Sequence, residues 1–158
     1  MYYYNNSGKL QTSPIPIKGK TAVPLTADQA KICIGFDSQG NPIFDNSILE
    51  KEQARAKEKA VYEIKTAFEN ACVKTGVALN GIYPMLSGVT INNPKFQYDF
   101  DSINKLESVV SDARVGYWRS IENQNIVLTN QDKQTLLELL KVTYFTKFAE
   151  SRTAIDNL

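Results

Sequence analysis

The sequence contains no histidine, and this absence excludes more chemistry than any residue that is present. Histidine is the usual general base near neutral pH, the commonest metal ligand and the usual partner of a nucleophilic serine or cysteine. Most hydrolase and metalloenzyme mechanisms therefore lack their central side chain. We expect a protein that is not an enzyme and that uses no cofactor and no metal.

Cysteines and long apolar runs are also scarce. Cys33 and Cys72 lie too far apart for a CxxC metal or redox motif, so we expect both to be small buried groups. No run approaches the roughly 18 apolar residues of a membrane span, and the first residues lack the basic and apolar regions of a secretory leader. These features predict a soluble chain, made in a cytosol, with no membrane partner.

Charge of one sign is not in excess either. Eighteen Lys and Arg residues against 17 Asp and Glu residues leave a net charge of +1, so we expect no nucleic-acid partner. Hydrophobic residues make up 42% of the 158 residues and charged residues 22%, which is typical of globular proteins. A chain of this length corresponds to one domain, or to one domain with an appendage.

The first 45 residues are predicted to form a β-rich docking module. Asn5–Gly8 is a turn signal between two short strand-like runs, which predicts a hairpin. Pro14, Pro16 and Pro24 then favour extended, irregular chain. A second hairpin is predicted across 37–41, where the 35–42 stretch has the glycine spacing of a phosphate loop but lacks its Lys and its Ser or Thr.

The remainder, 46–158, is predicted to be a domain of helices and small hairpins. A long helix over about 48–75 begins at a capping box of Ser47 and Glu50 and stops at Gly76. Its first half is charged, and this half is interpreted either as a solvated face or as a connector that projects the N-terminal hairpins or packs with copies of itself. Its second half carries an apolar stripe made of Val61, Ile64, Phe68, Ala71 and Cys72.

Two more helices and two hairpins are expected beyond Gly76. Asn80-Gly81 predicts a hairpin, Asp101 or Ser102 is expected to cap a short helix over about 102–115, and a hairpin follows across 122–125. Thr129 and Asp132 predict the start of a helix over about 130–156. Its apolar stripe consists of Leu136, Leu137, Leu140, Tyr144, Phe148 and Ile155. The predicted fold class is α+β.

Candidate partner-binding residues lie in the N-terminal module. Tyr2, Tyr3 and Tyr4 offer large, rigid contact area, although a hairpin with one inward tyrosine is an equally good interpretation. Phe36 and Phe44, on the second hairpin, complete the set. Asp99 and Asp101 could share one face of a strand as an acid and base pair, but helix capping is the favoured interpretation.

Two stretches carry a resemblance to a known group of proteins. The start, with Tyr2–Tyr4, 15–19 and 35–43, resembles the opening of tail-fibre and tail-fibre-assembly proteins of tailed bacteriophages. The end, Tyr117-Trp118-Arg119 through an Asn-containing turn to Leu128-Thr129 and a long helix, is similar to a small domain of phage tail-fibre-associated proteins. The second likeness covers roughly residues 50–158.

The resemblance implies a virion or virion-assembly protein without catalytic activity. It marks Trp118, Arg119, Asn123, Leu128 and Thr129, which also have structural roles: Trp118 and Leu128 would pack under the helices, Asn123 would make the turn and Thr129 would cap. The expected role is a structural adaptor in the virion tail, present in several copies and bound to other tail or fibre proteins. The alternatives are an assembly chaperone that leaves the virion, a host-directed regulatory binder and a small carboxylate-dependent enzyme.

Overall fold

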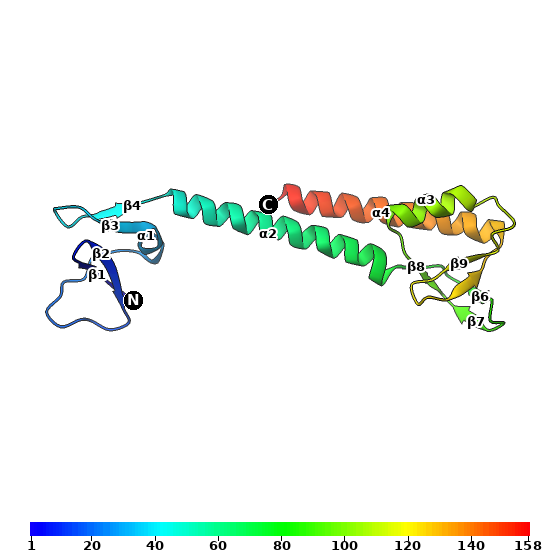
Figure 1. The fold of residues 1–158 in the computed structure, drawn as a ribbon, viewed down its shortest axis with the longest axis horizontal. Coiled ribbons are helices and arrows are strands. Elements are labelled where there is room, and N and C mark those ends of the chain that lie inside the picture. Colours follow the sequence, from blue (N-terminus) through cyan, green and yellow to red (C-terminus); the bar gives the residue numbers. More distant parts are fainter. The chain divides into compact units, whose positions relative to one another are not determined.

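The computed structural model describes residues 1–158 and confirms the α+β class. The chain divides into two compact units, Met1–Glu58 and Lys59–Leu158, and each is described by itself. The division falls inside helix α2 (Ser47–Asn70), whereas the boundary inferred from the sequence was placed at residue 45, before this helix (Figure 1). The first unit therefore includes the charged first half of α2.

The first unit contains the two predicted hairpins. Strand β1 (Tyr2–Asn6) pairs antiparallel with β2 (Lys9–Ser13), and β3 (Cys33–Phe36) pairs antiparallel with β4 (Pro42–Phe44). A short helix, α1 (Ala27–Ile32), precedes β3 and begins at a capping box of Thr26 and Gln29. The backbone amide of Phe36 donates to the carbonyl of Gly8 (3.2 Å), which ties one hairpin to the other.

The predicted Ser47–Glu50 capping box is wrong. Ser47 is already the first helical residue of α2, and its backbone amide donates to Asp45 Oδ1 at 2.9 Å. The amide of Glu50 donates instead to the carbonyl of Asn46 at 3.3 Å. The helix therefore begins one residue earlier than the capping pattern requires, and the carboxylate of Asp45 satisfies one of its free amides.

The helical segment ends where the sequence predicts, but its last turn is wider than an α-helix. A π-helical turn, η1 (Ala71–Thr75), follows α2, and the amide of Gly76 donates to the carbonyl of Ala71 (3.1 Å). Gly76 has a φ of 64°, and a Cβ at this position would lie 2.8 Å from the carbonyl oxygen of Phe96. Glycine is therefore required by both the backbone conformation and the space available.

The hairpin predicted at Asn80-Gly81 does not form. Strand β5 (Val77–Ala78) pairs with β8 (Lys95–Phe96), and β6 (Ile82–Pro84) pairs with β7 (Thr90–Asn92). The amide of Gly81 donates to Asn93 Oδ1, and the amide of Asn93 donates to the carbonyl of Gly81, both at 2.8 Å. The chain before and at Gly81 thus finds its partners in a distant segment and not across its own turn.

The later hairpin and the last helix follow the prediction closely. Strand β9 (Tyr117–Arg119) pairs antiparallel with β10 (Asn125–Val127). Helix α4 spans Asn130–Asp156, and the Thr129 hydroxyl accepts from the amide of Asp132 at 3.1 Å. The local spacing of a cap residue and an acid three positions later was sufficient to locate this helix.

The short helix is displaced from its predicted range. Helix α3 spans Phe100–Val109, and its N-cap is Asp99, not Asp101 or Ser102. Asp99 Oδ1 accepts from the amide of Ser102 (2.9 Å) and Oδ2 accepts from its hydroxyl (2.7 Å). The helix starts two residues before 102 because Asp99 is the residue that satisfies its first amides.

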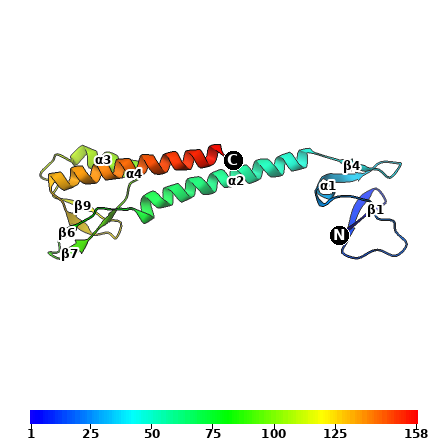
Figure 2. The ribbon, with the colours of Figure 1, turned by 180° about the vertical axis from the view of Figure 1, so that it is seen from behind.

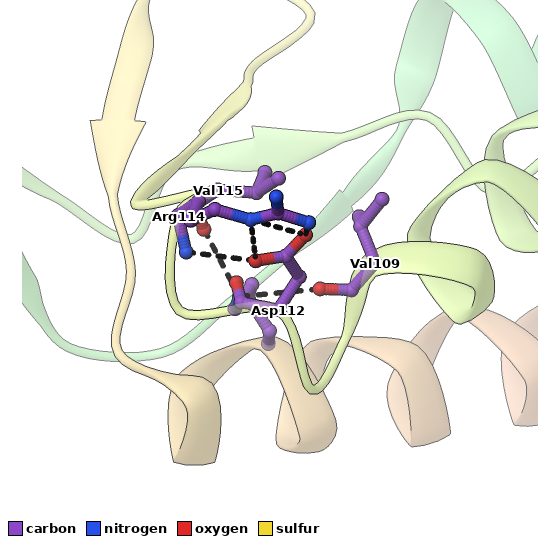
Figure 3. Close-up of polar contacts among 5 residues, drawn as sticks. Val109, Asp112, Arg114 and Val115 are labelled. Carbon is purple, nitrogen blue, oxygen red and sulfur yellow. Dashed lines mark hydrogen bonds and ion pairs between the residues drawn. The ribbon is translucent and has the colours of Figure 1, made fainter.

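A buried lysine lies at the C-terminal end of α3, and this helix ends well before Gly116. The side chain of Lys133, from α4, is fully buried, and its Nζ donates to the carbonyls of Val109 (3.3 Å), Asp112 (2.7 Å) and Val115 (2.9 Å). Figure 3 shows these three residues around the turn that leaves α3, with the Asp112 carboxylate bound by Arg114. The hydrogen bonds from Arg114 hold the pKa of Asp112 below its usual value. The ammonium of Lys133 thus binds the carbonyls at and just after the C-terminal end of α3, whereas the sequence predicts that this helix continues to 115.

The core of the second unit lies between α3, α4 and the strands. Helices α3 and α4 pack against one another and run side by side in both ribbon views (Figures 1 and 2). The fully buried apolar side chains there include Phe96, Leu106, Ile126, Leu136 and Leu140. None of the helices combines the length and the apolar character that crossing a bilayer requires.

Candidate interaction surfaces

The candidate partner-binding residues of the first unit differ in exposure. Tyr4 is 1% exposed and Phe36 is 8% exposed, so both rings are buried in the first unit, and their burial does not favour the prediction that they bind a partner. The Tyr4 hydroxyl accepts from the amide of Ile17 at 2.9 Å, which anchors the loop after β2. The first hairpin thus matches the alternative with one inward tyrosine. Tyr2 and Phe44 are exposed, and Tyr3 is half-buried.

The β3–β4 hairpin exposes three large apolar side chains, Ile34, Ile43 and Phe44, which we call the hairpin apolar set. Sequence reasoning identified Phe44 but missed the two isoleucines. The register between β3 and β4 shifts between Cys33 and Gly35, so the simple alternation of inward and outward residues fails at Ile34. Only the structure shows which of these apolar residues are left in solvent.

The turn of this hairpin is held by Asp37. Its Oδ1 accepts from the amides of Gln39 (2.9 Å) and Asn41 (2.8 Å), and its Oδ2 accepts from the side-chain amide of Asn41 (3.1 Å). The hydrogen bonds from Asn41, followed by those from Gln39, lower the pKa of Asp37 from its ordinary value. The sequence predicts a hairpin turn here, and the structure shows that one carboxylate organises it.

The residues marked by the phage-tail resemblance lie around the β9–β10 hairpin. Trp118 is half-buried against the core, Leu128 is buried within it, and Thr129 caps α4. Asn123 adopts a φ of 66° in the turn, and its amide donates to the carbonyl of Ser120 (3.0 Å). Arg119 is exposed. Trp118, Asn123, Leu128 and Thr129 thus have contacts that account for them within the fold.

The acidic residues considered for acid and base chemistry make separate contacts. Asp99 caps α3, while Asp101 pairs with Lys105 one turn later on the same helix. No group of three or more Cys, Asp or Glu side chains is arranged to hold a metal ion. Both carboxylates are therefore accounted for by the start of α3.

The second unit contains an open groove of about 370 Å³ along the end of α2 and η1, the second half of α4 and the start of α3. We call it the aromatic groove. Its apolar lining is Phe68, Cys72, Val73, Phe100, Tyr144, Phe148 and Ile155. Phe100 is 55% exposed and Phe148 is 44% exposed, so the rings are accessible. Sequence reasoning placed most of these residues on apolar stripes of helices but did not predict that the stripes remain uncovered.

The rings in the groove contact one another. Tyr144 lies at the centre, with ring centroids 5.6 Å from Phe68, 6.0 Å from Phe100 and 6.0 Å from Phe148, and its ring is nearly parallel to that of Phe148. Aromatic pairs at these separations are stabilising beyond their buried area. The groove floor is therefore a preformed apolar surface.

Charged residues border the groove at two distinct ends. Ile64 borders Ser151, and Phe68 lies against Tyr144, so α4 runs antiparallel to α2 along the groove (Figure 2). Lys65 on α2 and Arg152, one turn beyond Phe148 on α4, both line the groove, and we call their side of it the basic end. Glu69, one turn later on α2, and Asp99, at the start of α3, lie at what we call the acidic end.

Cys72 lies in the groove lining but is not a reactive thiol. Its side chain is 2% exposed, and burial raises its pKa to about 11, with a further contribution from the negative charge of Asp99. The thiol is therefore neutral near pH 7, whereas the thiolate is the nucleophilic form. Its role in the groove is that of a small apolar side chain.

No protein-family model, no curated protein and no solved structure matches this chain.

Proposed function

We propose that this chain is a non-enzymatic structural adaptor of a bacteriophage tail or tail fibre, which acts by binding another tail or fibre protein. The observation that carries the proposal is the hairpin apolar set of the first unit, in which Ile34 is 61%, Ile43 is 43% and Phe44 is 39% exposed. Several exposed large apolar side chains on one short hairpin favour a protein–protein contact.

The energetics of the hairpin are compatible with docking. Complete burial of a large apolar side chain is worth about 1.5–3 kcal/mol. Roughly half of the surface of each of these three side chains is still exposed, so its burial by a partner would contribute about 2–4 kcal/mol of binding free energy in total. The turn held by Asp37 already fixes the backbone, which reduces the entropy lost on binding.

The choice of a phage tail protein as the partner rests on the resemblance of the N-terminal and C-terminal stretches to tail-fibre-associated proteins. We expect the chain to remain in the virion in several copies. The neutral thiol of Cys72 and the capping role of Asp99 supply no catalytic group and are consistent with a binding role.

Mass spectrometry of purified phage particles from infected cells tests the proposal. The full-length chain should be present in particles, and the double variant Ile34→Ser/Ile43→Ser should be depleted from them although it folds. The matched control is Ile15→Ser/Ile82→Ser, which changes two isoleucines that are exposed by 68% and 71% and lie outside the hairpin. This control should be incorporated normally.

Two outcomes would contradict the proposal. Equal incorporation of both double variants would exclude the hairpin as the docking surface. Absence of the unmodified chain from particles would exclude a virion component, and loss of fibres from infected cells lacking the chain would then favour an assembly chaperone.

A further inference from the structure

We infer that the aromatic groove of the second unit is the surface through which two copies of this chain pair, with two-fold symmetry and with the basic end of each groove facing the acidic end of the other. This inference goes beyond the proposed function and does not depend on it, because the groove is separate from the hairpin apolar set.

The helices that border the groove lack a second layer. Helix α2 has no buried residue in its entire length, and the buried residues of α4 all lie at or before Leu140. From residue 141 onward, α4 therefore presents Tyr144 and Phe148 to α2 on one side and to solvent on the other. Helices are stable in proteins when their apolar stripe is covered by another layer, and a single pair of helices leaves one side of each stripe open.

The charges around the groove identify a second copy as the occupant. Lys65 and Arg152 lie at one end, and Glu69 and Asp99 lie at the other. In a two-fold symmetric contact the same surface is used by both copies, so the surface must be complementary to itself. Two grooves placed face to face and antiparallel bring each basic end against an acidic end, while a parallel arrangement brings like charges together.

The available area is that of a small interface. The helical segments 59–75 and 141–156 are about 24 Å long, and two helices side by side are about 20 Å wide, which gives a face of about 480 Å² per copy. A symmetric contact therefore buries on the order of 1,000 Å², at the lower limit for a specific interface. We accordingly expect a dimer with a dissociation constant in the micromolar range.

Sedimentation equilibrium of the purified full-length chain tests the inference directly. The unmodified chain should be dimeric at about 100 µM and dissociate on dilution to about 1 µM. The variant Lys65→Glu/Arg152→Glu makes both ends of the groove acidic, and its dimer should be at least tenfold weaker. The control Lys57→Glu/Arg119→Glu changes two exposed basic residues outside the groove by the same total charge and should dimerise as the unmodified chain does.

A mixing experiment tests whether the groove charges of one copy face the groove charges of the other. The variant Glu69→Lys/Asp99→Asn removes the acidic end, and asparagine keeps the ability to cap α3. It should dimerise poorly alone, but an equimolar mixture with Lys65→Glu/Arg152→Glu should form a heterodimer, because opposite charges then meet at both ends.

Three results would overturn the inference. These are a monomeric unmodified chain at about 100 µM, which is well above the expected dissociation constant, an unweakened dimer of Lys65→Glu/Arg152→Glu, and a mixture that stays monomeric. Because these measurements use the purified chain alone, their failure is distinguishable from failure of the phage-particle experiment.

Discussion

Replacement of Lys133 by methionine should destabilise the second unit more than any surface substitution. Its ammonium is fully buried and donates to three backbone carbonyls, those of Val109, Asp112 and Val115. Methionine keeps much of the apolar stem but provides no donor, so all three hydrogen bonds from Lys133 are lost. The carbonyls of Val109 and Asp112 still accept from the amides of Asp112 (3.0 Å) and Val115 (3.2 Å), whereas the Val115 carbonyl loses its donor. A hydrogen bond to a charged group contributes about 1.5 kcal/mol at the lower limit, which gives about 4.5 kcal/mol for three.

Part of that loss is recovered, because the methionine side chain removes the cost of burying a charge. We therefore expect the free energy of unfolding to fall by about 3 kcal/mol, a large fraction of the total for a domain. Lys133→Arg should also be destabilising, because the larger planar guanidinium does not fit the fully buried site that the compact ammonium occupies.

Urea denaturation followed by the fluorescence of Trp118 measures this change, since Trp118 is the only tryptophan and lies in the second unit. The control is Lys147→Met on the same helix. Lys147 is exposed and pairs only with Glu150, so its loss should change the stability by less than about 0.5 kcal/mol. Similar small effects of Lys133→Met and Lys147→Met would refute the reasoning that the buried ammonium closes α3.

Two further predictions concern the same unit. Thr129→Ala removes the hydroxyl that accepts from the amide of Asp132 and should lower the unfolding free energy by about 1 kcal/mol in the same assay, whereas no measurable change would show that the cap is dispensable. The raised pKa of Cys72 means that the unfolded chain releases the thiol proton near pH 9 while the folded chain keeps it to about pH 11. The protonated thiol therefore stabilises the folded chain fully below pH 9, and this contribution is lost as the pH rises from 9 to 11. The unfolding free energy should fall less steeply over this range in Cys72→Ala than in the unmodified chain. Parallel pH profiles of the unfolding free energy for the two chains would contradict the burial argument.

Local signals predicted those elements whose structure is determined locally. Helix α4 was located by the Thr129–Asp132 spacing and its apolar stripe, and the hairpin turn at Asp37 by its short polar residues. The hairpin at Asn80-Gly81 was not correctly predicted, because Asn93 competes for the backbone of Gly81 from a distant part of the chain. A local turn signal does not show whether the backbone of the turn forms hydrogen bonds with a more distant segment instead.

The candidate surfaces could be predicted only in part, for the same physical reason. The stripes of α2 and α4 contain Phe68, Tyr144 and Phe148, and their spacing shows that these rings share a face with core residues. Spacing does not show that the core ends near Leu140 and leaves the rings in a groove. The burial of Lys133 was missed because a lysine is ordinarily solvated, and its partners are carbonyls that the sequence does not distinguish.

The charged first half of α2 has a consequence for how the chain can vary. Every side chain from Glu50 to Lys59 is exposed, so no packing contact depends on the number of residues in this stretch. Insertion or removal of two complete turns there would leave the interiors of both units unchanged. The stretch can therefore serve as a spacer whose length is open to selection independently of folding.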